Sequence, residues 1–371
     1  MLIGVPKEIK VHEYRVGLTP DSVREFTAHG HSVLVETNAG IGIGSSDDDY
    51  RAAGADITPT ASEIFAQTDM IVKVKEPQAV ERQMLRPSQI LFTYLHLAPD
   101  PDQTRDLVNS GAICIAYETV TDGQGGLPLL APMSQVAGRL SIQAGAAALE
   151  RAKGGRGILL GGVPGVAPAK VVVIGGGVVG TQAARMALGL GARVFILDKN
   201  LNRLRELDSL FGPMLRTIYS TPSSVEEMIR EADLIVGAVL VPGKAAPRII
   251  TREMFAHAEA GSVFTDVAID QGGCAETSHA TTHDDPTYVE EGVIHYCVAN
   301  IPSACARTST LALTHATMPF VLKLADKGFP KALKEDPHLM NGLNVCLGEM
   351  TNASVAEDLG YRYTPPEKCL K

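Results

Sequence analysis

The chain has 371 residues, of which 45% are hydrophobic and 20% are charged, and its net charge is −9. This length exceeds one ordinary hydrophobic core and predicts a globular protein of two domains. The negative charge disfavours nucleic acid and anionic membrane surfaces as partners, because both require an excess of Lys and Arg.

The sequence has no sign of export or membrane insertion. Its N-terminus, MLIGVPKEIK, is charged where a signal peptide would be apolar. No uncharged apolar run approaches the ~18 residues of a membrane-spanning helix. The six cysteines form no C-x-x-C pair, and several lie in apolar stretches, where cysteine behaves as a small hydrophobe. We therefore expect a cytoplasmic protein with reduced thiols and neither a membrane nor nucleic acid as partner.

The N-terminal part alternates short apolar strands with helical stretches. Thr19 and Pro20 are suited to cap and open a helix that Gly30 ends. Such alternation predicts a parallel sheet covered by helices, an α/β domain in its own right. We expect its strands at residues 2–5, 33–36, 70–75, 90–96 and 112–118.

Polar side chains follow three of these strands. Arg15 lies in the loop after the first, Lys75 ends the third, and His96 ends the fourth. Ligands of open parallel sheets bind outside the carboxyl ends of the strands, so we expect all three at one edge. Two cations and an imidazole suit a small carboxylate substrate and a proton to be moved. The alternatives are a solvated Lys75, an Arg15–Glu13 ion pair worth under ~1 kcal/mol, and a His96 bonded to a backbone carbonyl.

A helix rich in small residues connects this part to the next. The sequence LPLLAPMSQVAGRLSIQAGAAALERAK, residues 127–153, places the helix start at about Ser134, a natural N-cap. A glycine- and proline-rich loop follows at residues 154–165.

The next stretch, VVVIGGGVVGTQAARMALGLGARVFILD, has the pattern of a dinucleotide site. Four β-branched residues form a strand, and Gly175, Gly177 and Gly180 follow at G-x-G-x-x-G spacing. The first glycine permits a tight turn, the second lets the backbone approach a pyrophosphate, and the third lets the next helix pack closely. That helix offers free N–H groups and its positive dipole end to the phosphates. The other interpretation is a glycine turn that binds no ligand.

Asp198 ends the second strand of this stretch, where the pattern requires an acid. Its carboxylate would bond the ribose hydroxyls and repel a 2′-phosphate, which favours NAD over NADP. Lys199 and Arg203 lie near enough in the chain to weaken that exclusion. NAD is therefore the expected cofactor.

Strands and helices continue to alternate after Asp198. Ser223 and Glu226 have capping-box spacing before a helix that ends near Ala232. Three further strands are expected at residues 234–240, 262–269 and 293–299.

These three strands end at residues that we expect to face the nicotinamide half of the cofactor, namely Val239, Leu240, Asp270 and Asn300. A buried Asp270 would need either a hydrogen-bond partner in the cleft or a catalytic role. His279 and His283 have the spacing of a helical metal pair, but their polar surroundings favour a solvated loop, and we expect no metal.

A last long helix is expected at residues 307–327, with Pro319 breaking or kinking it and Gly328 ending it. The residues that remain are too few for a separate core, so we expect them to pack on the first domain. The predicted domains are residues 1–128 with 307–371, which bind substrate, and residues 129–306, a Rossmann domain that binds NAD. We expect the two sheets to present their carboxyl ends to a shared gap that closes on NAD.

Several motifs, in their order along the chain, are those of one family. They are GVPKE, EYRVGLTP, KVKEP, LFTYLHLA, LPLLAPMSQVAGR, GGVPGV, VVVIGGGVVG, GAVLVPG, DVAIDQGG and VANIPS. In these motifs the chain resembles the L-alanine dehydrogenase family, which includes the N-terminal part of transhydrogenases. The resemblance runs from the first residues to about Pro319 and leaves the C-terminal residues unmatched.

The resemblance implies reversible oxidative deamination of L-alanine to pyruvate and ammonium with NAD, by a homohexamer whose substrate domain contains both ends of the chain. It implies that Arg15 and Lys75 bind the substrate, that His96 is the general acid/base, and that Asp270 assists at the reacting centre. The expected cofactor contacts are Ser134, Gly175, Gly177, Val178, Val179, Gly180, Asp198, Arg203, Ser220, Val239, Leu240, Ile269, Asp270, Val298, Asn300 and Ile301.

Other activities fit the same two-domain plan. The nearest is the soluble NAD-binding component of a proton-translocating transhydrogenase, which would pass hydride to a second nucleotide-binding protein. An enzyme that condenses two amino acids, as in opine or saccharopine chemistry, would need an amine larger than ammonium. An NAD sensor would bind NAD without turnover.

Overall fold

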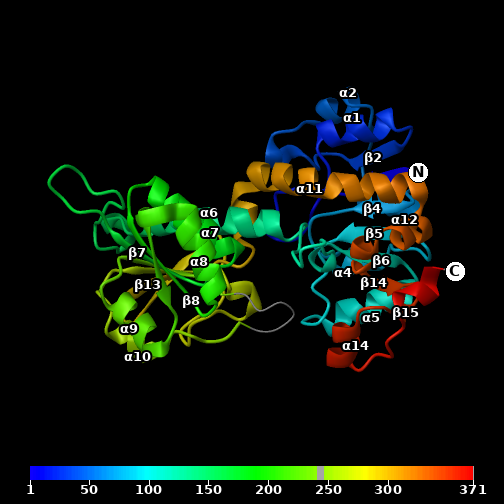
Figure 1. Cartoon of the computed structure of the whole chain (residues 1–371). Coiled ribbons are helices and arrows are strands. Elements are labelled where there is room, and N and C mark those ends of the chain that lie inside the picture. The colour runs from blue at the N-terminus through cyan, green and yellow to red at the C-terminus, as the bar shows by residue number, and fades with distance from the viewer. Residues whose placement is uncertain (240–245, 371) are drawn as a thin grey trace. The chain divides into compact units, whose positions relative to one another are not determined.

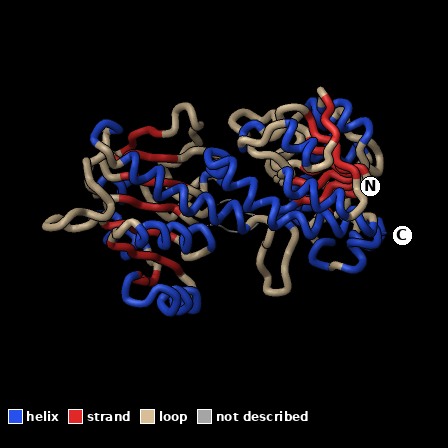
Figure 2. Tube along the Cα trace, turned by 90° about the horizontal axis from the view of Figure 1, so that it is seen from above, coloured by secondary structure: helices blue, strands red, loops and turns tan. Residues whose placement is uncertain are grey.

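The computed structural model describes residues 1–239 and 246–370. The chain divides into two compact units, Met1–Met133 with Ser303–Lys371, and Ser134–Pro302. Both ends of the chain lie in the first unit (Figure 1). Figure 2 shows the strands of each unit gathered in a layer with helices around it. The expected fold class, two α/β domains built on mostly parallel sheets, is confirmed.

The first unit contains one mixed sheet, in the order β15-β14-β6-β5-β4-β1-β2-β3. The strands from β3 to β6 in that order are parallel, and β14 and β15 are antiparallel additions. The strands are β1 (Leu2–Val5), β2 (Ser32–Glu36), β3 (Asp56–Thr58), β4 (Met70–Val72), β5 (Ile90–Thr93), β6 (Ile113–Ala116), β14 (Leu343–Cys346) and β15 (Glu349–Met350).

Most of the helices of this unit begin at a residue whose side chain caps them. Thr19 accepts the backbone N–H of Ser22, and Pro20 opens α1, as the sequence predicts. The helices are α1 (Pro20–Ala28), α2 (Asp47–Ala52), α3 (Ala61–Gln67), α4 (Ala79–Arg82), α5 (Pro101–Ser110), α11 (Ala306–Lys327), α12 (Phe329–Glu335), α13 (Pro337–Met340) and α14 (Ala353–Leu359).

Helix α11 runs through Pro319 without ending there. The expected end at Gly328 is confirmed, since this glycine has a φ of 72° at the C-cap. Leu313, Val321 and Leu324 are buried on both sides of Pro319. Packing of this apolar face stabilises the helix across the proline.

The C-terminal residues extend the first sheet. Strand β14 pairs with β6, so segments far apart in the sequence lie side by side (Figure 1). Val345, Met350 and Val355 join the same apolar cluster as Leu91 and Leu107. This tail is therefore part of the first core.

The second unit contains a sheet in the order β12-β13-β11-β10-β7-β8-β9. Val171 and Val173 of β7 enter one core cluster while Val172 and Ile174 enter another, so helices bury both faces. Its strands are β7 (Lys170–Ile174), β8 (Arg193–Asp198), β9 (Leu215–Tyr219), β10 (Leu234–Gly237), β11 (Val263–Asp266), β12 (Thr287–Glu290) and β13 (Val293–Tyr296). Its helices are α6 (Ala131–Ala148, entered from the first unit), α7 (Val178–Gly189), α8 (Leu201–Phe211), α9 (Pro222–Arg230) and α10 (Arg252–Ala256).

The two parallel sheets share one topology. When only the parallel strands of each unit are numbered in chain order, each follows the order 3-2-1-4-5-6, as β3-β2-β1-β4-β5-β6 and as β9-β8-β7-β10-β11-β13. In such sheets the connections turn to opposite faces between strands 1 and 4, and ligands bind at the carboxyl ends beside that point. The topology therefore marks the ends of β1 and β4 in one unit and of β7 and β10 in the other.

Two capping predictions are wrong. Helix α6 begins at Ala131, so Ser134 lies in its first turn, because Pro132 is tolerated where backbone N–H groups need no helical partner. Helix α9 is capped by Thr221 with Ser224, two residues earlier than the predicted Ser223 with Glu226, because Pro222 fixes the first helical position. Within the described residues, no helix is long and apolar enough to span a bilayer.

Candidate active site

The three glycines after β7 differ in what surrounds them. Gly175 has a φ of 105°, and a Cβ there would lie 2.5 Å from the carbonyl oxygen of Ala238. A Cβ at Gly180 would lie 1.8 Å from the carbonyl oxygen of Gly175. At Gly177 a Cβ would meet no atom within 4 Å among the described residues. The fold thus requires the first and third glycines, whereas the second opens onto space.

That open position lies at the N-terminus of α7. Gly177 is the N-cap, and Val178 and Val179 form the first turn. The N–H groups of a first helical turn have no partner within the helix, and they point along the positive end of its dipole. The turn therefore fits the pyrophosphate of a dinucleotide.

Asp198 and Arg203 hold this turn in shape. The carboxylate of Asp198 accepts the N–H of Gly176 at 2.6 Å and that of Asn200 at 2.8 Å. Arg203 donates to the carbonyl oxygen of Gly176 and to the hydroxyl of Thr181, both at 2.7 Å. Its third contact is an ion pair with Glu206. Arg203 therefore acts on the backbone of the glycine turn.

The other expected cofactor residues lie at or beyond the ends of the second sheet. Leu240 lies outside the described residues. Val239 is half-buried after β10, and Ser134 is half-buried in α6. Of the remainder, Asn300 is half-buried with a φ of 59°, and those that are buried are Ser220, Ile269, Val298 and Ile301.

Asp270 is exposed. It lies in a short 3-10 helix, η5 (Ile269–Gln271), where its carboxylate accepts the N–H of Asn300 at 3.1 Å. This hydrogen bond joins Asp270 and Asn300, the residues that follow the strands predicted at 262–269 and 293–299.

The buried acid of this region is Asp266, which sequence reasoning missed. Its carboxylate accepts the N–H groups of Ala268 and Cys274 and the hydroxyl of Ser278, at 3.0, 2.9 and 2.6 Å. Burial raises its pKa, against these hydrogen bonds. Asp266 closes the loop that carries Asp270. Its position as the last residue of β11 is the signal that could have found it.

In the first unit, Arg15 forms a buried ion pair with Glu13. Nε and Nη2 of the guanidinium donate to the two carboxylate oxygens at 2.7 and 2.6 Å, and the side chains are 2% and 0% exposed. Nη1 lies 2.9 Å from the sulfur of Met133. The pair is thus fixed and desolvated, unlike the surface ion pair that the sequence left open as an alternative.

The chain just after Arg15 passes close to the end of β4. A Cβ at Gly17 would lie 2.3 Å from the carbonyl oxygen of Val72, the last residue of that strand. Lys75 follows three residues later and is half-buried. The hydroxyl of Thr93, at the end of β5, donates to the carbonyl oxygen of Lys75 at 2.9 Å.

His96 occupies a strained backbone position just past β5. Its φ is 49°, which costs non-glycine residues energy and is common at functional sites. The carboxylate of Glu118 holds this conformation by accepting the N–H of Leu95 at 3.1 Å and that of His96 at 2.7 Å. One Glu118 oxygen also lies 3.9 Å from Nδ1 of the imidazole.

Tyr94 connects the imidazole with the buried part of the site. Its ring stacks on that of His96, with centroids 5.9 Å apart, and its hydroxyl donates to the carbonyl oxygen of Leu129 at 2.5 Å. The Arg15 charge acts on the Tyr94 hydroxyl, whose pKa burial raises. Arg15, Lys75 and His96 therefore lie along one edge of the first sheet, beyond β1, β4 and β5.

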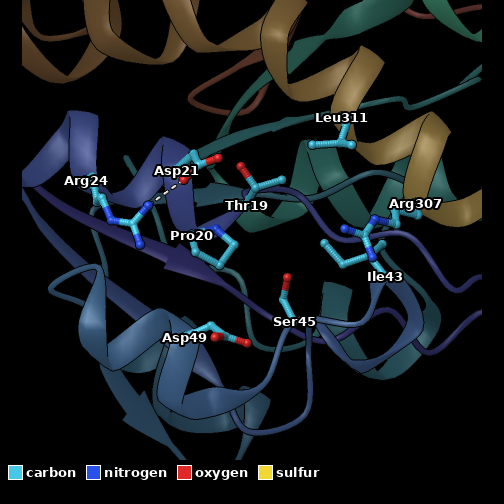
Figure 3. Close-up of a pocket in the computed structure, with 9 residues that line it drawn as sticks. All are labelled: Thr19, Pro20, Asp21, Arg24, Ile43, Ser45, Asp49, Arg307 and Leu311. Atoms are coloured by element: carbon cyan, nitrogen blue, oxygen red, sulfur yellow. Dashed lines mark hydrogen bonds and ion pairs between the residues drawn. The ribbon is translucent and has the colours of Figure 1, made fainter.

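Two other features do not carry the predicted chemistry. A hollow of about 280 Å³ at the start of α1 is lined by Thr19, Arg24 and Arg307, and in it Arg24 pairs with Asp21 (Figure 3). None of the predicted site residues lines this hollow. His279 is not in a helix, and its ring stacks on Tyr288 with centroids 3.6 Å apart.

Comparison with known families accounts for both units. Residues 4–137 match the model described as Alanine dehydrogenase/PNT, N-terminal domain, and residues 141–353 match Alanine dehydrogenase/PNT, C-terminal domain.

Relatives match over nearly the whole chain. The alanine dehydrogenase of Halomonas elongata is 60% identical, over 98% of each chain. That of Bacillus subtilis is 52% identical, over 100% of this chain and 98% of its own. That of Mycobacterium tuberculosis is 50% identical, over 100% of both.

Solved structures agree in fold. A structure of L-alanine dehydrogenase superposes with a TM-score of 0.94 at 51% identity, covering 97% of this chain and 99% of its own. A transhydrogenase from Sinorhizobium meliloti superposes with a TM-score of 0.83 at 24% identity, over 95% of this chain and 100% of its own, which shows a shared fold alone. The chain belongs to the alanine dehydrogenase family.

Proposed function

We propose that this protein catalyses the reversible, NAD-dependent oxidative deamination of L-alanine to pyruvate and ammonium. The observation that carries the proposal is the row of two cations and an imidazole at the carboxyl edge of the first sheet. It occurs in a chain whose alanine dehydrogenase relatives match it from end to end. The first unit then binds substrate and the second binds NAD.

The second unit suits NAD because its glycine turn leaves room where phosphate must approach the backbone. Gly177 supplies that room and α7 supplies the N–H groups. Asp198 has a carboxylate beside the turn, which accepts hydroxyl hydrogen bonds and repels a 2′-phosphate. Bound NAD would accept the hydride that leaves Cα of alanine.

Arg15 binds the substrate carboxylate. Glu13 fixes the plane of its guanidinium, so the charge and the direction of its N–H groups are set before substrate arrives. Lys75 places an ammonium at the oxygen of the keto group or carbinolamine, where negative charge develops.

His96 moves the protons. Deamination requires proton transfers when water attacks the imine and when ammonia leaves. An imidazole has an ordinary pKa near ~6.5 and can both accept and donate near neutral pH. A positioned group of this kind contributes about 10²- to 10⁴-fold in rate. Asp270 assists at the reacting centre, and its bond to Asn300 holds it at the end of its loop.

One assay tests the proposal. NADH, pyruvate and ammonium are mixed with the protein, and absorbance at ~340 nm, the reduced nicotinamide band, is followed. We expect oxidation of NADH that requires all three reactants. Hydride transfer to a second nucleotide without any need for ammonium would instead support the transhydrogenase alternative. Binding of NADH without any turnover would support an NAD sensor.

The assembly and location are also proposals. A homohexamer and a cytoplasmic location accompany the family resemblance. Light scattering on the purified protein tests the first, because a hexamer has six times the 39.3 kDa of the chain. Fractionation of the cells that make the protein tests the second.

A further inference from the structure

A buried lysine with two acidic partners lies beside the proposed substrate site. Nζ of Lys73 is 3.0 Å from Glu8 and 2.7 Å from Glu81, and the three side chains are 0%, 2% and 1% exposed. Burial by itself lowers the pKa of Lys73, but the two facing carboxylates outweigh it and raise the pKa to about 12. Lys73 is therefore a buried cation held by its two carboxylates.

The two acids have different second contacts. Glu81 accepts the N–H of Gln78 at 2.7 Å and so caps α4. Glu8 instead accepts the N–H of Val74 at 2.7 Å and that of Lys75 at 3.3 Å, both through Oε1. Of the two partners of Lys73, Glu8 is the one that touches the backbone of the proposed substrate residue.

The topology explains why a carboxylate is needed at this place. Strand β1 ends at Val5, and its pairing with β4 ends at Ile71. Beyond that point the N–H groups of residues 74 and 75 have no strand on the β1 side. A buried N–H must find an acceptor, and the Glu8 carboxylate takes the place of the missing strand.

On the other side, β5 continues to hold the same segment. The N–H of Tyr94 donates to the carbonyl oxygen of Val74 at 3.2 Å, and Thr93 donates to that of Lys75. The backbone at Lys75 is thus held between β5 and Glu8. Lys73 in turn holds Glu8 by its second oxygen.

We propose that Glu8 is a positioning residue for the reaction, which fixes the backbone of Lys75 and thereby the place of its ammonium against the substrate oxygen. This inference rests on the proposed function. Glu8 acts through Lys75 and does not touch the substrate.

Two substitutions of Glu8 separate the effect of its side-chain length from the effect of its charge. Glu8→Asp keeps the charge for Lys73 but is one methylene shorter, so it cannot hold Lys73 and the two N–H groups together. Glu8→Gln keeps the length and one acceptor oxygen for the two N–H groups, but its NH2 group would face the Lys73 ammonium, so it should lower the thermal midpoint. We expect Glu8→Asp to lower kcat/KM for pyruvate about 10- to 100-fold, as a misplacement near 1 Å does.

The matched control is Glu81→Asp, which shortens the other partner of Lys73. It should lower the thermal midpoint as much as Glu8→Asp while KM for pyruvate stays unchanged. NADH affinity, measured by fluorescence titration, should stay unchanged in all three variants, which also reports that the second unit is folded.

A double-mutant cycle gives the decisive readout. If Glu8 acts through Lys75, Glu8→Asp has no further effect on pyruvate affinity in a Lys75→Met background. Equal effects of Glu8→Asp and Glu81→Asp on KM for pyruvate would overturn the inference. An unmodified protein that does not reduce pyruvate with ammonium, or a Lys75→Met variant with normal pyruvate affinity, would overturn the proposed function itself.

Discussion

The glycines of the turn after β7 should respond in opposite ways to the same substitution. Gly177 has φ −66° and ψ −163°, an extended conformation open to any residue, and an added Cβ there would meet nothing within 4 Å among the described residues. Alanine at 177 should therefore fold normally. Its methyl group would stand where the pyrophosphate must approach.

The expected magnitudes follow from these contacts. The loss of an N-cap glycine and the gain of a stiffer unfolded chain are each about 1 kcal/mol or less and opposite in sign, so stability in Gly177→Ala changes little. The loss of one or two hydrogen bonds to a charged phosphate weakens NAD binding by about 1.5–3 kcal/mol, which is roughly 10- to 150-fold.

Gly180→Ala should do the reverse. Its Cβ would lie 1.8 Å from the carbonyl oxygen of Gly175, well inside contact distance, so α7 must move away from the strand. Overpacking of this kind costs about 1–3 kcal/mol or more, out of a total stability of about 5–15 kcal/mol. Gly175→Ala adds backbone strain at its φ of 105°, worth about 1–3 kcal/mol.

Two measurements decide this. Thermal unfolding followed by circular dichroism reports stability, and NADH fluorescence reports binding without interference from tryptophan, which the chain lacks. The argument is refuted if Gly177→Ala binds NADH normally, or if it unfolds as readily as Gly180→Ala.

The remaining predictions concern single charged or titratable residues. His96→Ala should lose about 10²-fold or more in turnover while NADH affinity persists, and near-normal turnover would remove His96 from the mechanism. Asp198→Gly should shift cofactor preference toward NADP, and an unchanged ratio of NAD to NADP activity would mean that the 2′-phosphate is excluded elsewhere. Glu13→Gln should destabilise the first unit by about 3–5 kcal/mol, because it leaves the buried Arg15 without its carboxylate, and it should raise KM for pyruvate; normal melting would contradict this. The folded state holds the Lys73 proton more tightly than the unfolded chain, so its contribution to stability is complete below pH 10.5 and declines as pH rises toward about 12; melting curves across that window test it.

The sequence predicts the parallel sheets and the edge at which polar residues gather, but it overextends the strands. Strands expected at 70–75 and 90–96 end at Val72 and Thr93. Val74 and Leu95 are buried all the same. An apolar pattern in the sequence indicates which residues are buried. A residue belongs to a strand only if its backbone also pairs with a neighbouring strand, and this pairing depends on the assembled sheet.

The partners of the site residues were harder to predict. Glu118 lies far from His96 in the sequence, and neither its type nor its neighbours indicate that it accepts the N–H groups of Leu95 and His96. Glu13 was recognised as a neighbour of Arg15, but its complete burial depends on elements that meet only in the fold. The C-terminal strands and strands β3, β9 and β12 were missed. Strands β3, β9 and β12 lie at the edges of their sheets, where few of their side chains are buried and the apolar pattern is weak.

A single physical device recurs at these sites. Backbone N–H groups just beyond the end of a strand have left the ladder and need acceptors. In four places a carboxylate accepts them. The N–H groups that follow β7 donate to Asp198, those that follow β4 to Glu8, those that follow β5 to Glu118 and those that follow β11 to Asp266. Each of these segments carries a predicted functional residue, namely Gly177, Lys75, His96 or Asp270.

The carboxylates therefore solve a problem that every open parallel sheet creates at its carboxyl edge. A carboxylate has two oxygens and accepts from two or three donors at once, and at Glu8 one oxygen accepts two N–H groups while the other accepts from Lys73. It can hold a short segment in a conformation that the ladder no longer enforces, such as the φ of 49° at His96. On this argument the acids contribute to catalysis by fixing the backbone from which the reacting side chains extend.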